Sequence, residues 1–274
     1  MIPPFQTLLT TLRPASRPAT ASSRPPVSPH RAPSPHYAIL SVAPRSYWKS
    51  TRKTPTQRGI TTDYLHVLHH ALNRFPHSSI VVFGHSLGAA AAICLLSQLY
   101  PSDRPASASV WKWHHRLPPS LTHDPKFSRV RGLVLENPFS SIPDMVHAFY
   151  PEKWLPYHYL GPLAIDKWDA LGALRRCAQS PSGPNKTEKD ASVLATLAPD
   201  ALVLHSEHDE MVPKQMGETI YGLAQAAVPP ARSNSHQIGR FVVVPRALHN
   251  TAWTKHAWAD EIKRYLGQLR SVER

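Results

Sequence analysis

Residues 80–96 constrain the fold more strongly than any other part of this 274-residue chain. An apolar run at 80–83 leads into Gly-His-Ser-Leu-Gly at 84–88, and small and apolar residues follow up to residue 96. This pattern predicts a buried strand, a sharp turn and a helix. A Gly-x-Ser-x-Gly turn in that context is typical of a nucleophile elbow, whereas the same letters elsewhere form ordinary glycine-rich turns. The segment favours an α/β fold that exposes Ser86.

A serine hydroxyl attacks a carbonyl when a base accepts its proton and N–H groups stabilise the oxyanion. The elbow raises the hydroxyl above the sheet on a strained backbone, so we expect no room for side chains at Gly84 and Gly88. The N–H of Leu87 lies at the positive end of the following helix. We therefore predict Leu87 as an oxyanion donor.

Two later segments provide an acid and a base in the order that α/β-hydrolases use. Residues 201–205 and 241–244 are apolar and predict two further buried strands. The first runs into a loop containing Asp209, and the second runs into a loop containing His249. The sequence thus predicts Ser86 as the nucleophile, Asp209 as the orienting acid and His249 as the general base.

The elbow, Glu-Asn-Pro-Phe-Ser-Ser-Ile-Pro at 136–143 and His-Asn-Thr-Ala-Trp at 249–253 resemble the bud-emergence-type (Bem) α/β-hydrolases. These abhydrolase-domain proteins are related to protein depalmitoylases and lysophospholipases. The resemblance, from about residue 37 to 266 with interruptions, implies a mostly parallel sheet with flanking helices and the same triad. It also implies cleavage of a lipid ester or a protein-palmitoyl thioester through an acyl-enzyme, with no cofactor or metal.

Other residues compete for the roles of acid and base. Glu207 and Glu210 flank Asp209, but the family places its acid three or four residues before a Val-Pro pair, which favours Asp209. His236 and His256 compete with His249, although neither directly follows a strand. Two more histidines have simpler explanations: His205 is expected in the core within its strand, and His85 is a common neighbour of such nucleophiles.

The chain departs from the family upstream of Ser86. Residues 37–42 predict a strand, and the following segment 47–50 resembles the turn after the family's fourth strand. No His-Gly-rich loop precedes Ser86, although such a loop supplies the second oxyanion N–H. We expect strands one to three and the membrane anchor to be absent, leaving an N-terminally incomplete sheet. The alternative function is a non-catalytic or truncated hydrolase-fold interaction protein.

The net charge of +13 is concentrated near the N-terminus, because residues 1–62 contain nine Lys or Arg and no Asp or Glu. Proline, serine and arginine at 1–36 predict a disordered basic tail. A transit peptide or an arm for anionic lipid are alternatives; without interleaved aromatic residues, nucleic acid is not expected as a partner. A partial hydrolase domain is predicted at 37–270, with inserted loops at about 102–128, 178–190 and 228–240.

Aromatic residues between 139 and 174 predict a small cap above the carboxyl ends of the strands. These aromatic residues either line a binding site for an acyl chain or pack the cap against its own sheet. No run of 18 apolar residues exists in the sequence, so the chain is expected to be soluble or peripheral on a membrane, through the tail or the cap. Two cysteines exclude a disulfide framework, and Cys94 is expected to be a buried apolar residue.

One further helix is expected to start at 61–63, and another is expected to span 253–269. The elbow helix is predicted to end near residue 100. The adjacent histidines at 114–115 lack spaced partners for a metal site. The oligomeric state is left open.

Overall fold

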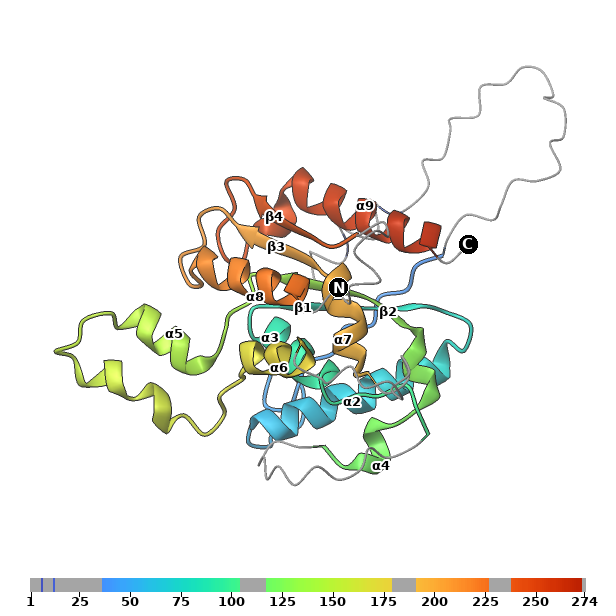
Figure 1. Ribbon diagram of the computed structural model, residues 1–274, viewed down its shortest axis with the longest axis horizontal. Helices are drawn as coiled ribbons and strands as arrows, with labels where there is room; N and C mark the ends of the chain where they lie inside the picture. The colour runs from blue at the N-terminus through green and yellow to red at the C-terminus, as the bar shows by residue number, and fades with distance from the viewer. Residues whose placement is uncertain are drawn as a thin grey trace, which may run out of the picture.

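The computed structural model describes residues 36–103, 117–178, 191–226 and 238–272, with Gln6 and Leu12 as isolated positions (Figure 1). Within these residues, four parallel strands form one sheet in the order β1-β2-β3-β4. The strands are β1 (Ile80–His85), β2 (Val130–Glu136), β3 (Leu202–Ser206) and β4 (Arg240–Val244). Helices cover both faces of this sheet. The architecture is that of the α/β-hydrolase fold.

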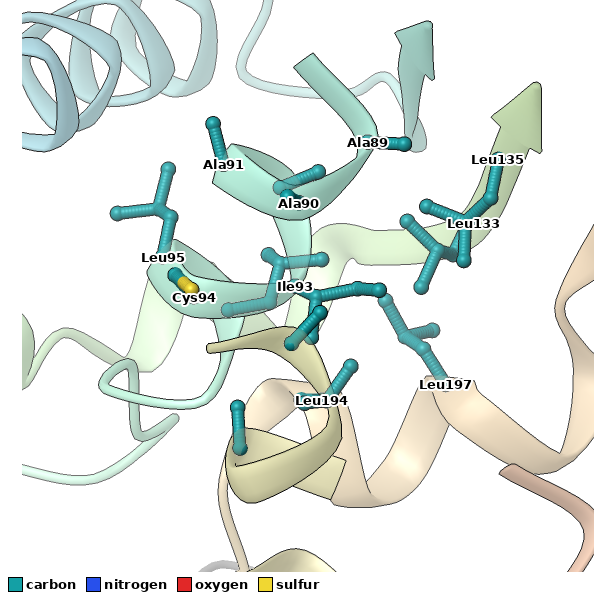
Figure 2. Close-up of a cluster of buried hydrophobic side chains, with 14 of the residues drawn as sticks. Ala89, Ala90, Ala91, Ile93, Cys94, Leu95, Leu133, Leu135, Leu194 and Leu197 are labelled. Carbon is teal, nitrogen blue, oxygen red and sulfur yellow. The ribbon is translucent and has the colours of Figure 1, made fainter. Parts of the chain in front are cut away.

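One face of the sheet packs against the elbow helix α3 (Leu87–Leu96) and its neighbours. These neighbours are α2 (Gln57–Arg74), α6 (Ala170–Ala178), α7 (Val193–Leu197) and α8 (Lys214–Ala226). Figure 2 shows side chains of α3 packed between Leu133 and Leu135 of β2 and Leu194 and Leu197 of α7. Cys94 lies in this cluster, as expected, and burial raises the pKa of its thiol to about 12.

The opposite face is covered by α9 (His256–Val272), whose Trp258, Ile262 and Tyr265 are buried against β2, β3 and β4. The hydroxyl of Tyr265 accepts the N–H of Leu133 at 3.0 Å, just before the β2–β3 ladder begins at Val134. The helix starts three residues later than expected, because 252–254 form a separate 3₁₀ turn.

The prediction of a strand at 37–42 is wrong. This segment has no assigned strand, and Leu40 and Val42 are exposed. A strand exists only where a neighbour pairs with it, and nothing in the described part of the chain pairs with this segment. Within the described residues, β1 pairs with β2 alone, so its other edge has no strand partner.

Several element boundaries also differ from expectation. Helix α2 begins at Gln57 rather than at 61–63, because the Thr56 hydroxyl caps it by accepting the N–H of Gly59. Helix α3 ends at Leu96, well before residue 100. The described end of the expected loop 102–128 contains two short helices, α4 (Pro119–Thr122) and η1 (Pro125–Arg129).

Parts of the predicted loops and of the tail lie outside the described residues. These are positions 104–116, which include the adjacent histidines, together with 179–190, 227–237 and most of 1–35.

Candidate active site

The nucleophile elbow has the strained backbone that its sequence predicts. Ser86 adopts φ 51° and ψ −117°, and its N–H donates to the carbonyl of Glu136 at 2.9 Å. A Cβ at Gly84 would lie 2.5 Å from the carbonyl oxygen of Gly88, so only glycine fits there. The expectation for Gly88 is wrong, because a Cβ at that position meets no atom within 4 Å. The elbow thus requires glycine on the strand side only.

The Asp209 and His249 side chains form a buried pair at the carboxyl ends of β3 and β4. His249 Nδ1 lies 2.8 Å from Asp209 Oδ2 and 3.0 Å from Oδ1. Asp209 Oδ1 also accepts the N–H groups of Met211 and Val212, each at 2.8 Å. Burial opposes ionisation of Asp209, but these hydrogen bonds outweigh it and lower the pKa of the carboxyl. The pair therefore contains a carboxylate that accepts from the imidazole.

The competing glutamates bind backbone groups of the histidine loop, 245–250. Glu207 Oε2 accepts the N–H of Arg246 at 2.7 Å, and Glu210 Oε2 accepts the N–H of His249 at 3.0 Å. Among the hydrogen bonds of the described residues, Asp209 contacts the His249 ring and neither glutamate does. Of the competing histidines, His256 begins α9 and His236 lies outside the described residues.

His85 connects the elbow to the histidine loop. Its Nε2 lies 3.0 Å from the carbonyl oxygen of His249, and the centroids of the two rings are 4.8 Å apart. The residue directly before Ser86 therefore contacts His249. Among the hydrogen bonds of the described residues, none joins Ser86 Oγ to His249, which is common in hydrolases without substrate. Leu87 opens α3, so its N–H has no acceptor within that helix.

His205 lies in the core, as expected. It is fully buried in β3, and its Nε2 contacts the carbonyl oxygen of Val212 at 3.1 Å. Burial lowers the pKa of the imidazole, so the ring is neutral. Its Nδ1 has no partner among the described atoms and faces Gly217, where a Cβ would lie only 2.8 Å away.

Glu136, the last residue of β2, and Asn137, which follows it, belong to the site, although sequence reasoning did not assign them a role. The Glu136 carboxyl is 4% exposed and accepts the indole N–H of Trp258 at 2.9 Å. Burial raises its pKa to about 7. Asn137 is fully buried and bonds both Ser206 and His249. The Glu-Asn pair at the start of the 136–143 motif is the sequence feature that could have pointed to these two residues.

The cap consists of α5 (Ile142–Phe149), two 3₁₀ turns, η2 (Pro156–Tyr159) and η3 (Gly161–Leu163), and the segment up to α6. It extends away from the sheet in Figure 1. Trp168 is buried, but most other large apolar side chains here are exposed: Phe149, Tyr150, Trp154, Tyr159, Leu160, Leu163 and Ile165. Burial in the core therefore accounts for Trp168 and not for the others.

None of the helices in the described ranges is long and apolar enough to cross a membrane.

Comparisons with known proteins find relatives of this chain among lipases. No protein-family model matches it. It is 27% identical over 186 residues to lysophosphatidylserine lipase ABHD12 of Macaca fascicularis, covering 68% of this chain and 37% of that protein. The ABHD12 lipase of Xenopus tropicalis is 26% identical over 197 residues, covering 72% and 40%. The chain spans about two fifths of the length of these relatives.

Solved structures with a similar arrangement share little sequence with this chain. A truncated carbohydrate esterase from gut microbiota gives a TM-score of 0.47 at 14% identity, covering 81% of this chain and 72% of that one. TT1662 from Thermus thermophilus gives 0.40 at 19% identity, covering 78% and 63%. It is the sequence relatives that support an abhydrolase-domain family for this chain, while the narrower Bem-type assignment stays a prediction.

Proposed function

We propose that this chain is a serine hydrolase that cleaves a carboxylic ester of a lipid through an acyl-enzyme. Ser86 Oγ attacks the ester carbonyl while His249 takes its proton, and the alcohol leaves with that proton. Water then adds to the acyl-enzyme by the same route and releases the acid. Asp209 keeps the Nδ1 proton on the imidazole. The buried Asp209–His249 hydrogen bond of 2.8 Å beside the strained elbow carries this proposal.

The triad chemistry does not distinguish an oxygen ester from a thioester. Both lipases above are named for lysophosphatidylserine, and this favours a lysophospholipid ester as the substrate of this chain. A protein-palmitoyl thioester is the second substrate class for the same acyl-enzyme mechanism. The Leu87 N–H is proposed as one oxyanion donor.

A non-catalytic or truncated hydrolase-fold interaction protein is the second candidate function. It is favoured by the missing His-Gly-rich loop in residues 1–85. The β1 edge, which has no strand partner within the described ranges, points the same way. Loss of one oxyanion donor lowers the rate about 10²- to 10³-fold. A hydrolase with this defect retains a nucleophile that reacts slowly.

Labelling by a fluorophosphonate probe decides between the two functions. We expect the wild-type chain to label and Ser86→Ala not to label. Ser97→Ala, which removes a serine at the other end of α3, should label like the wild type. Hydrolysis of lysophosphatidylserine and of a palmitoyl-thioester peptide then ranks the two substrate classes. If the wild type labels no better than Ser86→Ala, the enzyme proposal is wrong.

A further inference from the structure

The Asn137 side chain joins three segments that meet at the active-site edge of the sheet. Its Oδ1 accepts the N–H of Ser206 at 2.7 Å, and its Nδ2 donates to Ser206 Oγ at 3.1 Å. The same Nδ2 donates to the carbonyl oxygen of His249 at 2.8 Å. These bonds connect the end of β2 to the end of β3 and to the histidine loop. One amide thus links the two loops that supply the acid and the base.

The position requires asparagine for two independent reasons. Its backbone has φ 47°, a left-handed conformation that asparagine tolerates better than most other residues. Its side chain must accept from one N–H and donate to a carbonyl within a single short group. Of the short side chains, only the asparagine amide carries both a carbonyl oxygen and an NH₂ group. Because the side chain is fully buried, water does not replace either bond.

The His249 backbone is held on both sides. Its carbonyl accepts from Asn137 Nδ2 and lies 3.0 Å from His85 Nε2, while its N–H donates to Glu210 Oε2 at 3.0 Å. Burial lowers the pKa of His85, so that ring is neutral and donates through Nε2. Asp209 engages Nδ1 of the ring, and among the hydrogen bonds of the described residues none engages Nε2 of His249.

We propose that Asn137 is a positioning residue for the general base. The hydrogen bonds described for its side chain go to Ser206 and His249, and it acts by fixing the His249 carbonyl relative to the end of β3, which leads into the Asp209 loop. The inference rests on the proposed function, because it assigns Asn137 to the same reaction. Without the amide, the imidazole loses part of its fixed orientation toward Ser86, and turnover falls while substrate binding stays nearly unchanged.

Three variants isolate this role. Asn137→Ala removes all three side-chain bonds. Asn137→Asp keeps the size and the acceptor for the Ser206 N–H, but at pH 8 its carboxylate has no N–H to donate to His249. Ser206→Ala is the matched control, because it removes only the hydroxyl that Asn137 Nδ2 also contacts.

The readouts are the fluorophosphonate labelling rate per folded protein, kcat and KM on the best ester substrate, and the thermal midpoint. We expect both Asn137 variants to lose about 10- to 100-fold in labelling rate and kcat, with KM changed by less than about threefold. Ser206→Ala should stay within about threefold of the wild type. If Asn137→Ala does not fold, the near-isosteric Asn137→Asp gives the answer.

The low-field proton NMR signal of the Asp209–His249 hydrogen bond tests the positioning directly. The signal is assigned by its loss in His249→Ala, and we expect it to weaken or broaden in Asn137→Asp. If the variants are folded, keep this signal and label at the wild-type rate, the positioning role is refuted. If the wild type itself does not label, the proposed function fails, and the NMR signal alone decides whether Asn137 orders the histidine.

Discussion

The buried Glu136 carboxyl makes a pH-dependent contribution to stability that can be isolated by one substitution. The side chain lies at the end of β2 and accepts the indole N–H of Trp258 at 2.9 Å. Burial, the largest influence on this group, raises its pKa from 4.5 to about 7. Glu136→Gln keeps the volume and an amide oxygen for the indole, and it removes the titrating group.

The sign follows from proton binding in the two states. Between pH 4.5 and about 7, the folded chain holds the Glu136 proton more tightly than the unfolded chain does. The contribution of this carboxyl is fully present below pH 4.5 and is lost as the pH rises through about 7. The gap between these pKa values corresponds to about 3 kcal/mol at about 1.4 kcal/mol per pKa unit. As the pH rises, the free energy of unfolding of the wild type should fall by up to this amount relative to that of Glu136→Gln.

Urea unfolding of both proteins from pH 5 to pH 8.5 measures the effect, because titrating groups that do not interact with Glu136 cancel in the difference. We expect the free energy of unfolding of Glu136→Gln, relative to the wild type, to rise by about 2–3 kcal/mol across this range, because part of the change lies below pH 5. Glu152→Gln, the same substitution at an exposed position, is measured alongside as the control. A flat difference for Glu136→Gln would show that the carboxyl is already ionised in the folded protein, which would refute the reasoning.

Three further predictions concern packing, a buried hydrogen bond and the exposed cap. Gly84→Ala forces a Cβ against backbone atoms at 2.5 Å and should lower the free energy of unfolding by about 3 kcal/mol or more. Gly222→Ala, inside α8 with open space around it, is the control and should raise the free energy of unfolding by about 0.5–1 kcal/mol; both are measured by urea unfolding. Tyr265→Phe leaves the buried N–H of Leu133 without its acceptor and should cost about 1–3 kcal/mol by the same measurement; no change would mean that another acceptor replaces the hydroxyl. Peripheral membrane contact through the cap stays a prediction, and Trp154→Ser tests it at an 80% exposed position. This variant should weaken binding to neutral lipid vesicles, measured by co-sedimentation, by about 2 kcal/mol at any salt concentration, and its thermal midpoint should not change. Binding that high salt abolishes, and that Trp154→Ser leaves intact, would instead implicate the basic tail.

Local patterns were sufficient to predict the strands and the elbow that position the candidate site. Strand β4 begins one residue before its predicted range of 241–244, and β3 lies one residue later than the predicted 201–205 at both ends. Asp209 and His249 were predicted from their places after two strands. The structure brings them into contact because parallel strands end at the same edge of the sheet.

Features that depend on distant partners could not be read from the sequence. Residues 37–42 have the composition of a strand, but a strand also requires an adjacent edge, and that pairing leaves no local mark. A Cβ would be crowded at Gly84 but not at Gly88, because the first residues of α3 lie against Gly84. Asn137 belongs to a recognised motif, yet its partners are 69 and 112 residues away along the chain. Its role became visible only once those contacts were known.

The acid and histidine loops also show why neighbouring carboxylates of similar chemistry have different roles. Glu207 and Glu210 accept backbone N–H groups of the histidine loop, while Asp209 alone accepts from the imidazole. The loop backbones pair directly as well, because the His208 N–H donates to the carbonyl of Ala247 at 2.9 Å. In the proposed reaction, the ends of β2, β3 and β4 thus orient His249, whereas the proposed oxyanion donor Leu87 lies at the start of α3. Histidine positioning and oxyanion stabilisation therefore depend on different parts of the molecule, and a chain with a well-ordered Asp209–His249 pair can still turn over slowly.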